Sequence, residues 1–208
     1  MAERYVITLG RECGAGATYI AQHLSKELGI PYYDKDIFRM VSDKRGVLEE
    51  FFHVNSERPG NNLLYKLVKD LKPADQKPSL GKDIVSPDNL FRFQSELIRE
   101  LADNESCIII GRCADYVLKD HDNCVHVFVC GDMDSKVQRM MHSYSLEESA
   151  AVERIKETDK QRKKYYSYYT GGDWEAASNY DLCLNTGDMS IEEAAEQILF
   201  YLKQKKYI

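Results

Sequence analysis

A glycine-rich turn lies between the first apolar run of the chain and its first amphipathic segment. It spans residues 10–18 and reads Gly-Arg-Glu-Cys-Gly-Ala-Gly-Ala-Thr. Turns of this composition let backbone N–H groups surround a phosphate at the start of a helix, where the helix dipole also favours an anion. The amides that could do so belong to Gly14, Ala15, Gly16, Ala17 and Thr18. The other interpretation is a tight turn whose glycines serve geometry alone.

The turn departs from the phosphate-binding pattern G-x-x-x-x-G-K-[ST] at two positions. Arg11 stands where the first glycine belongs, and Ala17 stands where the lysine that reaches the outer phosphates belongs. Thr18 keeps the hydroxyl that binds Mg²⁺ in this pattern, so it is the candidate metal ligand. Arg11 either replaces the missing lysine, since a guanidinium binds phosphate bidentately, or pairs with Glu12 or Asp34.

The elements that must position this turn can be read from hydrophobic periodicity. Short apolar runs predict five strands, at residues 5–9, 30–33, 107–110, 125–129 and 180–184. Amphipathic segments predict helices that begin after Gly16 and at Pro87, Asp132, Ser145 and Ser190. Ser145 and Ser190 each have a glutamate three residues later, which is the pattern of a capping box. The alternation predicts an α/β fold with an open, doubly wound, parallel five-stranded sheet and helices on both faces.

We expect one domain over residues 1–208, with two excursions from its core. The core comprises residues 1–34, 87–141 and 176–208, and the excursions are residues 35–86 and 142–175. Both excursions leave the carboxyl edge of the sheet, where ligands of open α/β folds bind. Arg112 directly follows the third strand, so it should reach the same edge. There it could bind phosphate or form a salt bridge at the strand end.

The composition limits the classes of partner and compartment. The 28 basic and 34 acidic residues give a net charge of −6, which argues against a nucleic-acid polymer as partner, because binding one needs a basic face. The sequence shows no secretory signal and no apolar run of the ~18–20 residues that cross a membrane. We therefore expect a cytoplasmic protein that binds no membrane. The cysteines form no C-x-x-C pair, and we interpret Cys107, Cys130 and Cys183 as buried reduced thiols.

Five stretches of the chain, in order, carry a family pattern. They are I-T-L-G-R-E-C-G-A-G-A-T, G-I-P-Y-Y-D-K-D-I, I-I-I-G-R-C-A-D-Y-V-L, I-K-E-T-D-K-Q-R-K-K-Y-Y-S-Y-Y-T-G and N-Y-D-L-C-L-N-T-G. Because they run from residue 7 to residue 187, nearly the whole chain resembles the cytidylate kinase-like family of bacterial P-loop proteins, relatives of the nucleoside monophosphate kinases. The turn of that family resembles this one in lacking the lysine and in carrying an Arg-Glu pair.

The resemblance implies phosphoryl transfer from ATP, with Mg²⁺, to a nucleoside monophosphate, with CMP or dCMP as the default acceptor. It also implies that residues 35–86 bind the acceptor and that residues 142–175 form a lid. Gly111-Arg112 with Asp115 resembles the Gly-Arg-Asp acceptor site of cytidylate kinases, although two residues separate Arg112 from Asp115. Asp34 would hold Mg²⁺ through water, contact the acceptor or cap the segment after it. A homodimer is possible.

The lid stretch carries several charged residues on one predicted helix. Arg154 and Arg162 resemble the lid arginines that close over the phosphates, and Asp159 can pair with Arg162 three residues later. Arg139, on the preceding helix, would flank the donor nucleotide. Any of these charges could instead lie on a solvated helix face. The tyrosines after the basic run, with Trp174, are expected to pack the lid onto the core or a partner subunit.

Two other functions remain open at this point. The absence of the lysine favours a nucleotide- or phosphate-binding protein that has lost catalysis and acts as a sensor or partner. A kinase for a small molecule other than a nucleotide is the third interpretation, because the acceptor stretch contains no readable motif. The basic lid and Thr18 favour the nucleoside monophosphate kinase.

Overall fold

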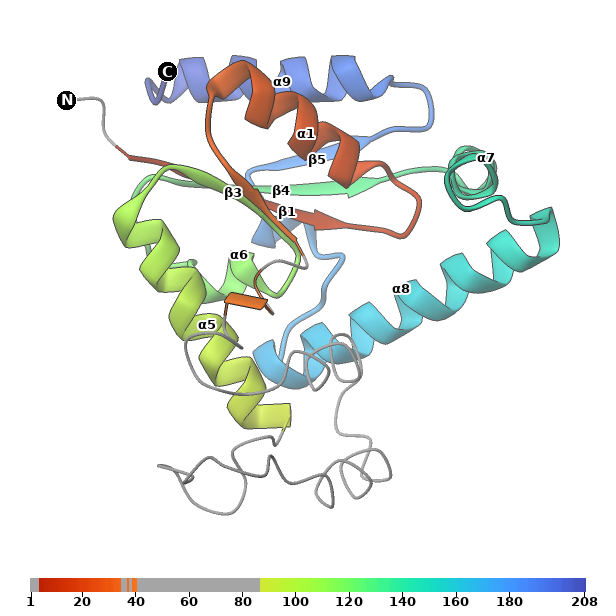
Figure 1. Cartoon of the computed structure of the whole chain (residues 1–208), viewed down its shortest axis with the longest axis horizontal. Helices are drawn as coiled ribbons and strands as arrows, with labels where there is room; N and C mark the ends of the chain where they lie inside the picture. Colours follow the sequence, from red (N-terminus) through yellow and green to blue (C-terminus); the bar gives the residue numbers. More distant parts are fainter. Residues whose placement is uncertain (1–3, 35–36, 38, 41–86) are drawn as a thin grey trace.

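The computed structural model describes residues 4–34, 37, 39–40 and 87–208 (Figure 1). The predicted acceptor-binding stretch, residues 35–86, lies almost wholly outside the described residues. Within these described residues, five parallel strands form one sheet in the order β2-β3-β1-β4-β5. The strands are β1 (Val6–Arg11), β2 (Tyr32–Tyr33), β3 (Cys107–Ile110), β4 (Cys124–Cys130) and β5 (Leu182–Asn185).

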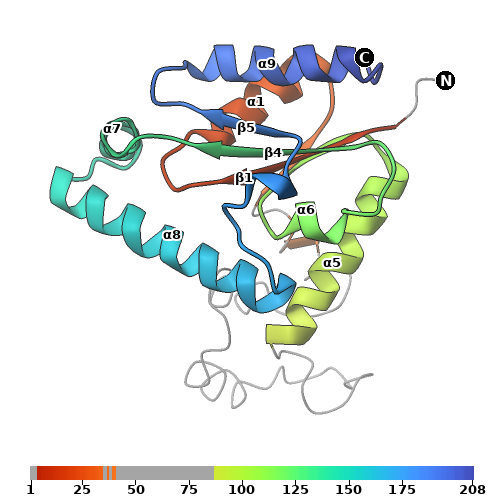
Figure 2. The same cartoon turned by 180° about the vertical axis from the view of Figure 1, so that it is seen from behind.

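Helices cover both faces of the sheet, which confirms the predicted doubly wound α/β fold. They are α1 (Ala17–Leu28), α5 (Pro87–Asn104), α6 (Ala114–Val117), α7 (Met133–Tyr144), α8 (Glu148–Thr170) and α9 (Ile191–Gln204), with a short 3₁₀ turn at Ala177–Asn179. Figures 1 and 2 show α1 and α9 on one face and α5 and α6 on the other. The order of the strands reverses at β1, so the turn after β1 lies at the switch point where such folds bind ligands.

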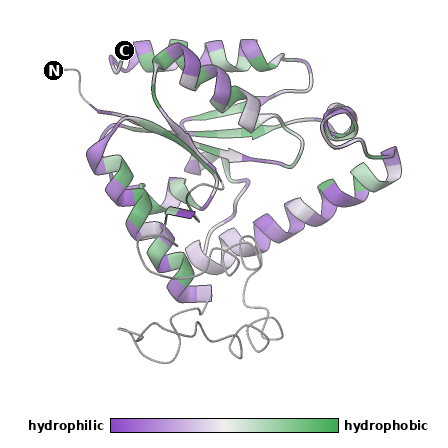
Figure 3. Cartoon of the chain, in the orientation of Figure 1, coloured by the Kyte–Doolittle hydropathy of each residue, from purple (hydrophilic) through white to green (hydrophobic). Residues whose placement is uncertain are grey.

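Side chains that point alternately to the two faces of the sheet form a separate hydrophobic cluster on each face. Ile7 and Leu9 of β1 pack in the cluster with α1 and α9, whereas Val6 packs in the cluster with α5 and α6. In β3, Ile108 packs in the cluster with α1 and α9, and Ile109 packs in the cluster with α5 and α6. Because side chains of a strand point alternately to its two faces, a strand covered on both sides must be apolar throughout. The uninterrupted apolar runs of the sequence reflect this burial, as Figure 3 shows for the sheet.

Two helix starts share one sequence pattern but differ in structure. At α9 the Ser190 side chain accepts a hydrogen bond from the Glu193 N–H, and the Glu193 carboxylate accepts one from the Ser190 N–H, so the predicted capping box is confirmed. The box predicted at Ser145 is wrong. Ser145 ends α7 with a left-handed φ of 51°, and α8 begins at Glu148 after Glu147, without a side-chain cap. The chain needs three residues to turn between the two helices.

The cysteines are all reduced, but the burial of two of the three differs from the prediction. Cys107 is buried and Cys130 is half-buried, whereas Cys183 is exposed. Cys183 lies on β5, an edge strand of the sheet, and faces outward there. Within the described residues, every helix is too short or too polar to span a membrane.

Helix α8 crosses below the carboxyl edge of the sheet and is anchored at both ends. Near its start, Ala151 and Ile155 pack with Cys13 of the turn and with Val137 and Met140 of α7. At its far end, an aromatic cluster packs against β4 and α6; its buried members are Cys113, Phe128, Tyr165, Tyr166 and Trp174. The prediction that this aromatic stretch packs against the core is therefore confirmed. Most of the remaining helix is hydrophilic (Figure 3).

Candidate functional site

A cavity of about 500 Å³ opens at the carboxyl edge of the sheet, between the glycine-rich turn, α7 and α8. Most of the predicted site residues line it: Arg11, Gly14, Gly16, Ala17, Thr18, Asp34, Arg112, Arg139, Arg154 and Arg162. Ala15 lies behind the turn and is fully buried. Asp115 and Asp159 lie outside the lining of this cavity. The fold thus gathers residues from most of the length of the chain at one place.

The turn exposes backbone N–H groups to this cavity. Strand β1 ends at Arg11, and α1 begins at Ala17 after Gly16, whose φ of 88° is left-handed. Gly14 also has a positive φ, of 80°, so both positions favour glycine. Within the described part of the chain, no acceptor binds the amides of Gly14, Gly16, Ala17 and Thr18. An anion at the start of α1 would find these donors and the positive end of the helix dipole.

A buried threonine and an arginine hold the turn from behind. Thr186, just after β5, is fully buried, and its Oγ1 lies 2.9 Å from the Ala15 carbonyl oxygen and 3.1 Å from that of Cys130. The Arg139 guanidinium donates to the Gly14 carbonyl at 3.3 Å, to Thr186 Oγ1 at 3.1 Å and to the Thr186 carbonyl. Burial lowers the pKa of Arg139, against the opposing charge of Asp132. Arg139 therefore fixes the turn as well as lining the cavity.

Two arginines meet one carboxylate beside the turn. Asp34 Oδ1 lies 3.7 Å from Arg11 Nη2 and 3.8 Å from Arg112 Nη2. The structure therefore shows the pairing of Arg11 with Asp34 that the sequence left as one alternative, and it shows a strand-end salt bridge for Arg112. Both guanidinium groups still line the cavity. Asp34 neutralises part of their charge and orients them toward the turn.

The basic residues of α8 reach the same cavity. Arg162 donates from Nη1 to the Arg11 carbonyl oxygen at 3.1 Å. It also lies 4.0 Å from Asp159 Oδ1, the pairing that the spacing predicted. Arg154 is exposed and places its guanidinium 4.5 Å from the centre of the Tyr144 ring. Together with Arg11, Arg112 and Arg139, these side chains surround the mouth of the turn with positive charge.

Asp159 binds the turn itself. Its Oδ1 accepts a hydrogen bond of 2.6 Å from the Cys13 N–H, and its Oδ2 lies 3.4 Å from Lys136 Nζ. Lys136 also donates to Glu12 Oε2 at 3.0 Å. Burial raises the pKa of Asp159, although the Cys13 amide, Lys136 and Arg162 oppose the rise. Burial lowers the pKa of Lys136, but Glu12 and Asp159 outweigh it, so its pKa lies above the usual value.

Lys136 and Thr186 are site residues that the sequence analysis did not identify. Lys136 stands on a helix among other charged residues, where a solvated position is the default, yet it is 5% exposed. Thr186 follows an edge strand and lies in the last of the five family stretches, where the sequence assigned it no role. Their positions become clear only when α7 and β5 are placed beside the turn. A small hydroxyl residue at the carboxyl end of a predicted strand is a further signal for Thr186.

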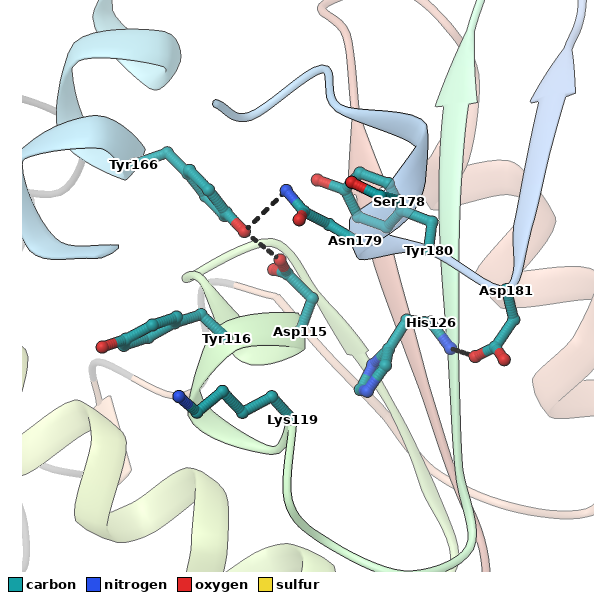
Figure 4. A pocket seen from close by; sticks show the side chains of 9 residues that line it. All are labelled: Asp115, Tyr116, Lys119, His126, Tyr166, Ser178, Asn179, Tyr180 and Asp181. Atoms are coloured by element: carbon teal, nitrogen blue, oxygen red, sulfur yellow. Dashed lines mark hydrogen bonds between the residues drawn. The ribbon is translucent and has the colours of Figure 1, made fainter. Parts of the chain in front are cut away.

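Asp115 lies beside this site in a separate setting. It is buried on α6, and the Tyr166 hydroxyl donates to its Oδ2 at 2.7 Å. Burial raises its pKa, and the hydrogen bond from Tyr166 opposes that rise. Asp115 lines a small pocket together with Arg112, and also a pocket of about 350 Å³ with Lys119 and His126 (Figure 4). It is thus a neighbour of Arg112 rather than part of the main cavity.

The oxygen donors of the main cavity are compatible with a magnesium ion. Mg²⁺ at phosphate sites takes one or two protein ligands and fills its other positions with water and phosphate oxygens. Thr18, with its hydroxyl group, and Asp34, with its carboxylate, are both among the residues that line the cavity. In the part of the chain that the structure describes, no group of three or more histidine, cysteine or acidic side chains could hold a metal alone.

Comparisons with known proteins agree with this architecture. The model of the cytidylate kinase-like family matches residues 6–188. A cytidylate kinase of Methanopyrus kandleri is 27% identical over 198 residues, which is 90% of this chain and 88% of that protein. The crystal structure of an uncharacterized protein from Eubacterium ventriosum superposes with a TM-score of 0.69 at 27% identity, covering 96% of this chain and 99% of the other.

A more distant neighbour shares only the fold. Shikimate kinase from Acinetobacter baumannii superposes with a TM-score of 0.53 at 14% identity, covering 99% of this chain and 96% of the other. The family match spans β1 to the end of β5 and includes the turn, Arg112 and the basic part of α8. The chain therefore belongs to the cytidylate kinase-like family.

Proposed function

We propose that this protein transfers the terminal phosphate of ATP to a nucleoside monophosphate, with CMP or dCMP as the acceptor and with Mg²⁺. One observation carries the proposal. A turn with available amides opens onto a cavity that also receives five arginine side chains, Arg11, Arg112, Arg139, Arg154 and Arg162. Phosphoryl transfer depends on positioning and on positive charge around the moving group, and it needs little covalent help from the protein. The family match and the kinase names among its relatives support this reaction class.

The residues divide into a donor side and an acceptor side. The amides of Gly14, Gly16 and Ala17 would bind the donor phosphates, and Thr18 would hold Mg²⁺, with Asp34 acting through water. Bound there, Mg²⁺ neutralises charge on the phosphate oxygens. Arg112, which is buried and oriented by Asp34, would hold the phosphate of the acceptor. One of its oxygens then attacks the terminal phosphorus of ATP while the bond to the ADP oxygen breaks.

Arg11 is our candidate for the charge that the missing lysine would supply. It ends β1, lines the cavity and pairs with Asp34, so its guanidinium is held near the turn. Arg154 and Arg162 of α8 approach from the other side. Asp115 would act on the acceptor side through its position beside Arg112.

A binding protein without catalysis is the second candidate. Ala17 removes one cation from the turn, and the loss of a single electrostatic contact of this kind reduces a rate by about 10²–10³. The carboxylate of Asp159 at the Cys13 amide also favours this candidate, because it places a negative charge where phosphate would bind. The assay below separates the two functions.

The decisive experiment is a coupled assay of ADP release with CMP, dCMP, UMP, AMP or GMP, and with no acceptor. We expect turnover that depends on a pyrimidine monophosphate and that falls about 10²–10³-fold in Arg112→Ala. Arg99→Ala removes an exposed arginine of α5, far in sequence from the site, and should leave turnover unchanged. Thermal unfolding of both variants checks that the fold persists. ATP binding by calorimetry without turnover on any acceptor would establish the sensor instead.

A further inference from the structure

One of the amides in the phosphate-binding turn already has an anionic partner from the same chain. The Cys13 N–H donates to Asp159 Oδ1 at 2.6 Å, a short hydrogen bond of the charge-assisted kind. Asp159 lies near the middle of α8, 146 positions along the chain from Cys13. The contact therefore exists only because the fold brings α8 against the turn.

A buried lysine holds this carboxylate in place. Lys136 of α7 places its ammonium between Glu12 of the turn, at 3.0 Å, and Asp159, at 3.4 Å. Its backbone also closes the back of the turn, because a Cβ at Gly14 would lie 2.8 Å from the Lys136 carbonyl oxygen. The turn, α7 and α8 thus meet in one charge cluster with little access to water.

A phosphate in this turn would meet a like charge. The neighbouring amides of Gly14, Gly16 and Ala17 are available to it, but the carboxylate on Cys13 repels it and withholds one donor. The Cys13 amide can donate to a phosphate only after its hydrogen bond to Asp159 has broken. Phosphate binding and the Asp159 contact are therefore coupled.

We propose that the Asp159 carboxylate is an intramolecular competitor of the phosphate group that binds the glycine-rich turn, and that Lys136 holds it there. The proposal rests on the phosphate-binding part of the proposed function and not on the transfer step. When a phosphoanhydride displaces Asp159, the carboxylate remains beside Lys136 and Arg162. The affinity for donor phosphates is then lower than the turn would have without Asp159. Binding of phosphate to the turn also changes the hydrogen bonding of Asp159 on α8.

The test measures binding of inorganic tripolyphosphate by calorimetry to the full chain and to Asp159→Asn. The asparagine oxygen can still accept from the Cys13 N–H, so the contact remains while its charge is lost. We expect Asp159→Asn to bind tripolyphosphate about tenfold more tightly at about pH 7.5, a change that corresponds to one modest charge repulsion. Glu153→Gln is the matched control, because it removes one negative charge from an exposed position of the same helix. Its affinity should equal that of the wild type.

A pH series separates competition from a structural effect. The charged and titratable groups that face Asp159 are Lys136 from α7, Arg162 from α8, and Glu12 and the Cys13 thiol from the turn. Protonation of Asp159 removes its charge, so the advantage of Asp159→Asn should shrink toward one as the pH falls through the raised pKa of Asp159. Asp159→Ala should give the same direction of change, should the asparagine variant fold poorly.

Three results would overturn the inference. They are an Asp159→Asn affinity equal to or weaker than that of the wild type, an advantage independent of pH, and no tripolyphosphate binding by either protein. Tighter binding by Asp159→Asn in a protein without turnover on any acceptor would leave the inference standing while the proposed kinase reaction fails.

Discussion

Asp115 and Asp159 are two carboxylates whose pKa values burial raises, and they belong to different parts of the molecule. Asp159 has a buried lysine and a backbone amide beside it, whereas Asp115 has the hydroxyl of Tyr166. A nearby cation offsets part of the desolvation cost of a buried carboxylate. A carboxylate that relies on a neutral donor bears more of the desolvation cost. The charged form of Asp115 therefore lowers the stability of the folded protein more than the charged form of Asp159 does.

Replacement of Asp115 by asparagine should change the pH dependence of the free energy of unfolding. The folded protein holds the Asp115 proton more tightly than the unfolded chain. Its stabilising contribution is therefore full below the unfolded pKa of about 3.9 and is lost as the pH rises through the raised folded pKa. Asp115→Asn has no proton to lose and can still accept from Tyr166. We expect its free energy of unfolding to rise relative to wild type between about pH 4 and about pH 7.

Urea unfolding at these two pH values measures this difference. Asp120→Asn, at an exposed position just after α6, is the matched control and should show no such change with pH. A difference between Asp115→Asn and the wild type that is the same at both pH values would contradict the assignment of the cost to Asp115.

Most of the candidate residues that the sequence identified follow a predicted strand or lie in one of the five family stretches, and Arg139 and Arg154 are the exceptions. Arg112 directly follows β3 and reaches the predicted edge, because the direction of a strand determines where its next residue lies. Lys136 has no such relation to an element end. Its burial depends on Glu12 and Asp159, which come from two other segments. Contacts of this kind depend on packing and not on local pattern.

At the scale of the element, the start of α9 contributes stability that can be measured alone. Ser190 accepts from the Glu193 N–H at 3.1 Å, and Ser190→Ala leaves that amide without its partner. We expect a loss of about 1 kcal/mol in the free energy of unfolding, measured by urea denaturation. Ser149→Ala, an exposed serine in the first turn of α8 that makes no cap, should change stability much less. Equal losses in the two variants would mean that the cap contributes nothing.

The two capping patterns show how far local sequence predicts element boundaries. Ser190 and Ser145 have the same spacing to a glutamate, yet only Ser190 begins a helix. Helix α7 continues up to Tyr144, so Ser145 is used to end it in a left-handed conformation. Where one helix ends close to the start of the next, the sequence pattern does not show whether a serine ends the first helix or caps the second. The strands were predicted within about two residues, and the signal is strongest for β1 and β3, whose burial on both faces requires apolar side chains throughout.

At the scale of the whole molecule, the single tryptophan marks the junction between α8 and the core. Trp174 is 5% exposed and packs edge-to-face on Phe128 of β4, with the ring centroids 5.3 Å apart. Tyr165 and Tyr166 are buried in the same cluster. Exposure of one large apolar side chain costs about 1.5–3 kcal/mol, so undocking this end of α8 would cost a multiple of that.

We therefore expect Trp174 fluorescence to be insensitive to nucleotide. Saturation with ATP and Mg²⁺ should leave its emission maximum unchanged, whereas urea unfolding should shift it to the red as water reaches the ring. Titration of the fluorescence with each ligand measures this directly, and calorimetry on the same samples confirms that nucleotide binds. A red shift on binding would show that the far end of α8 leaves the core.

The fold class followed from the sequence because alternating strands and helices allow few arrangements, whereas the order of the strands came only from the structure. Residue contacts across the sheet edge did not follow, since they depend on the exact placement of α7 and α8. The acceptor-binding role of residues 35–86 lies outside the described residues and stays a prediction.

The double anchoring of α8 has a kinetic consequence. A helix that is packed against the core at both ends cannot move away from it at its middle. Asp159 and Arg162 lie between Ile155 and Tyr166, which belong to the two packed ends of α8. These two side chains must then respond to an incoming anion by rotating about their own bonds, whereas hinged closure of a helix takes microseconds to milliseconds. Exchange of Asp159 for a phosphate oxygen on the Cys13 amide should for that reason need no movement of the helix itself.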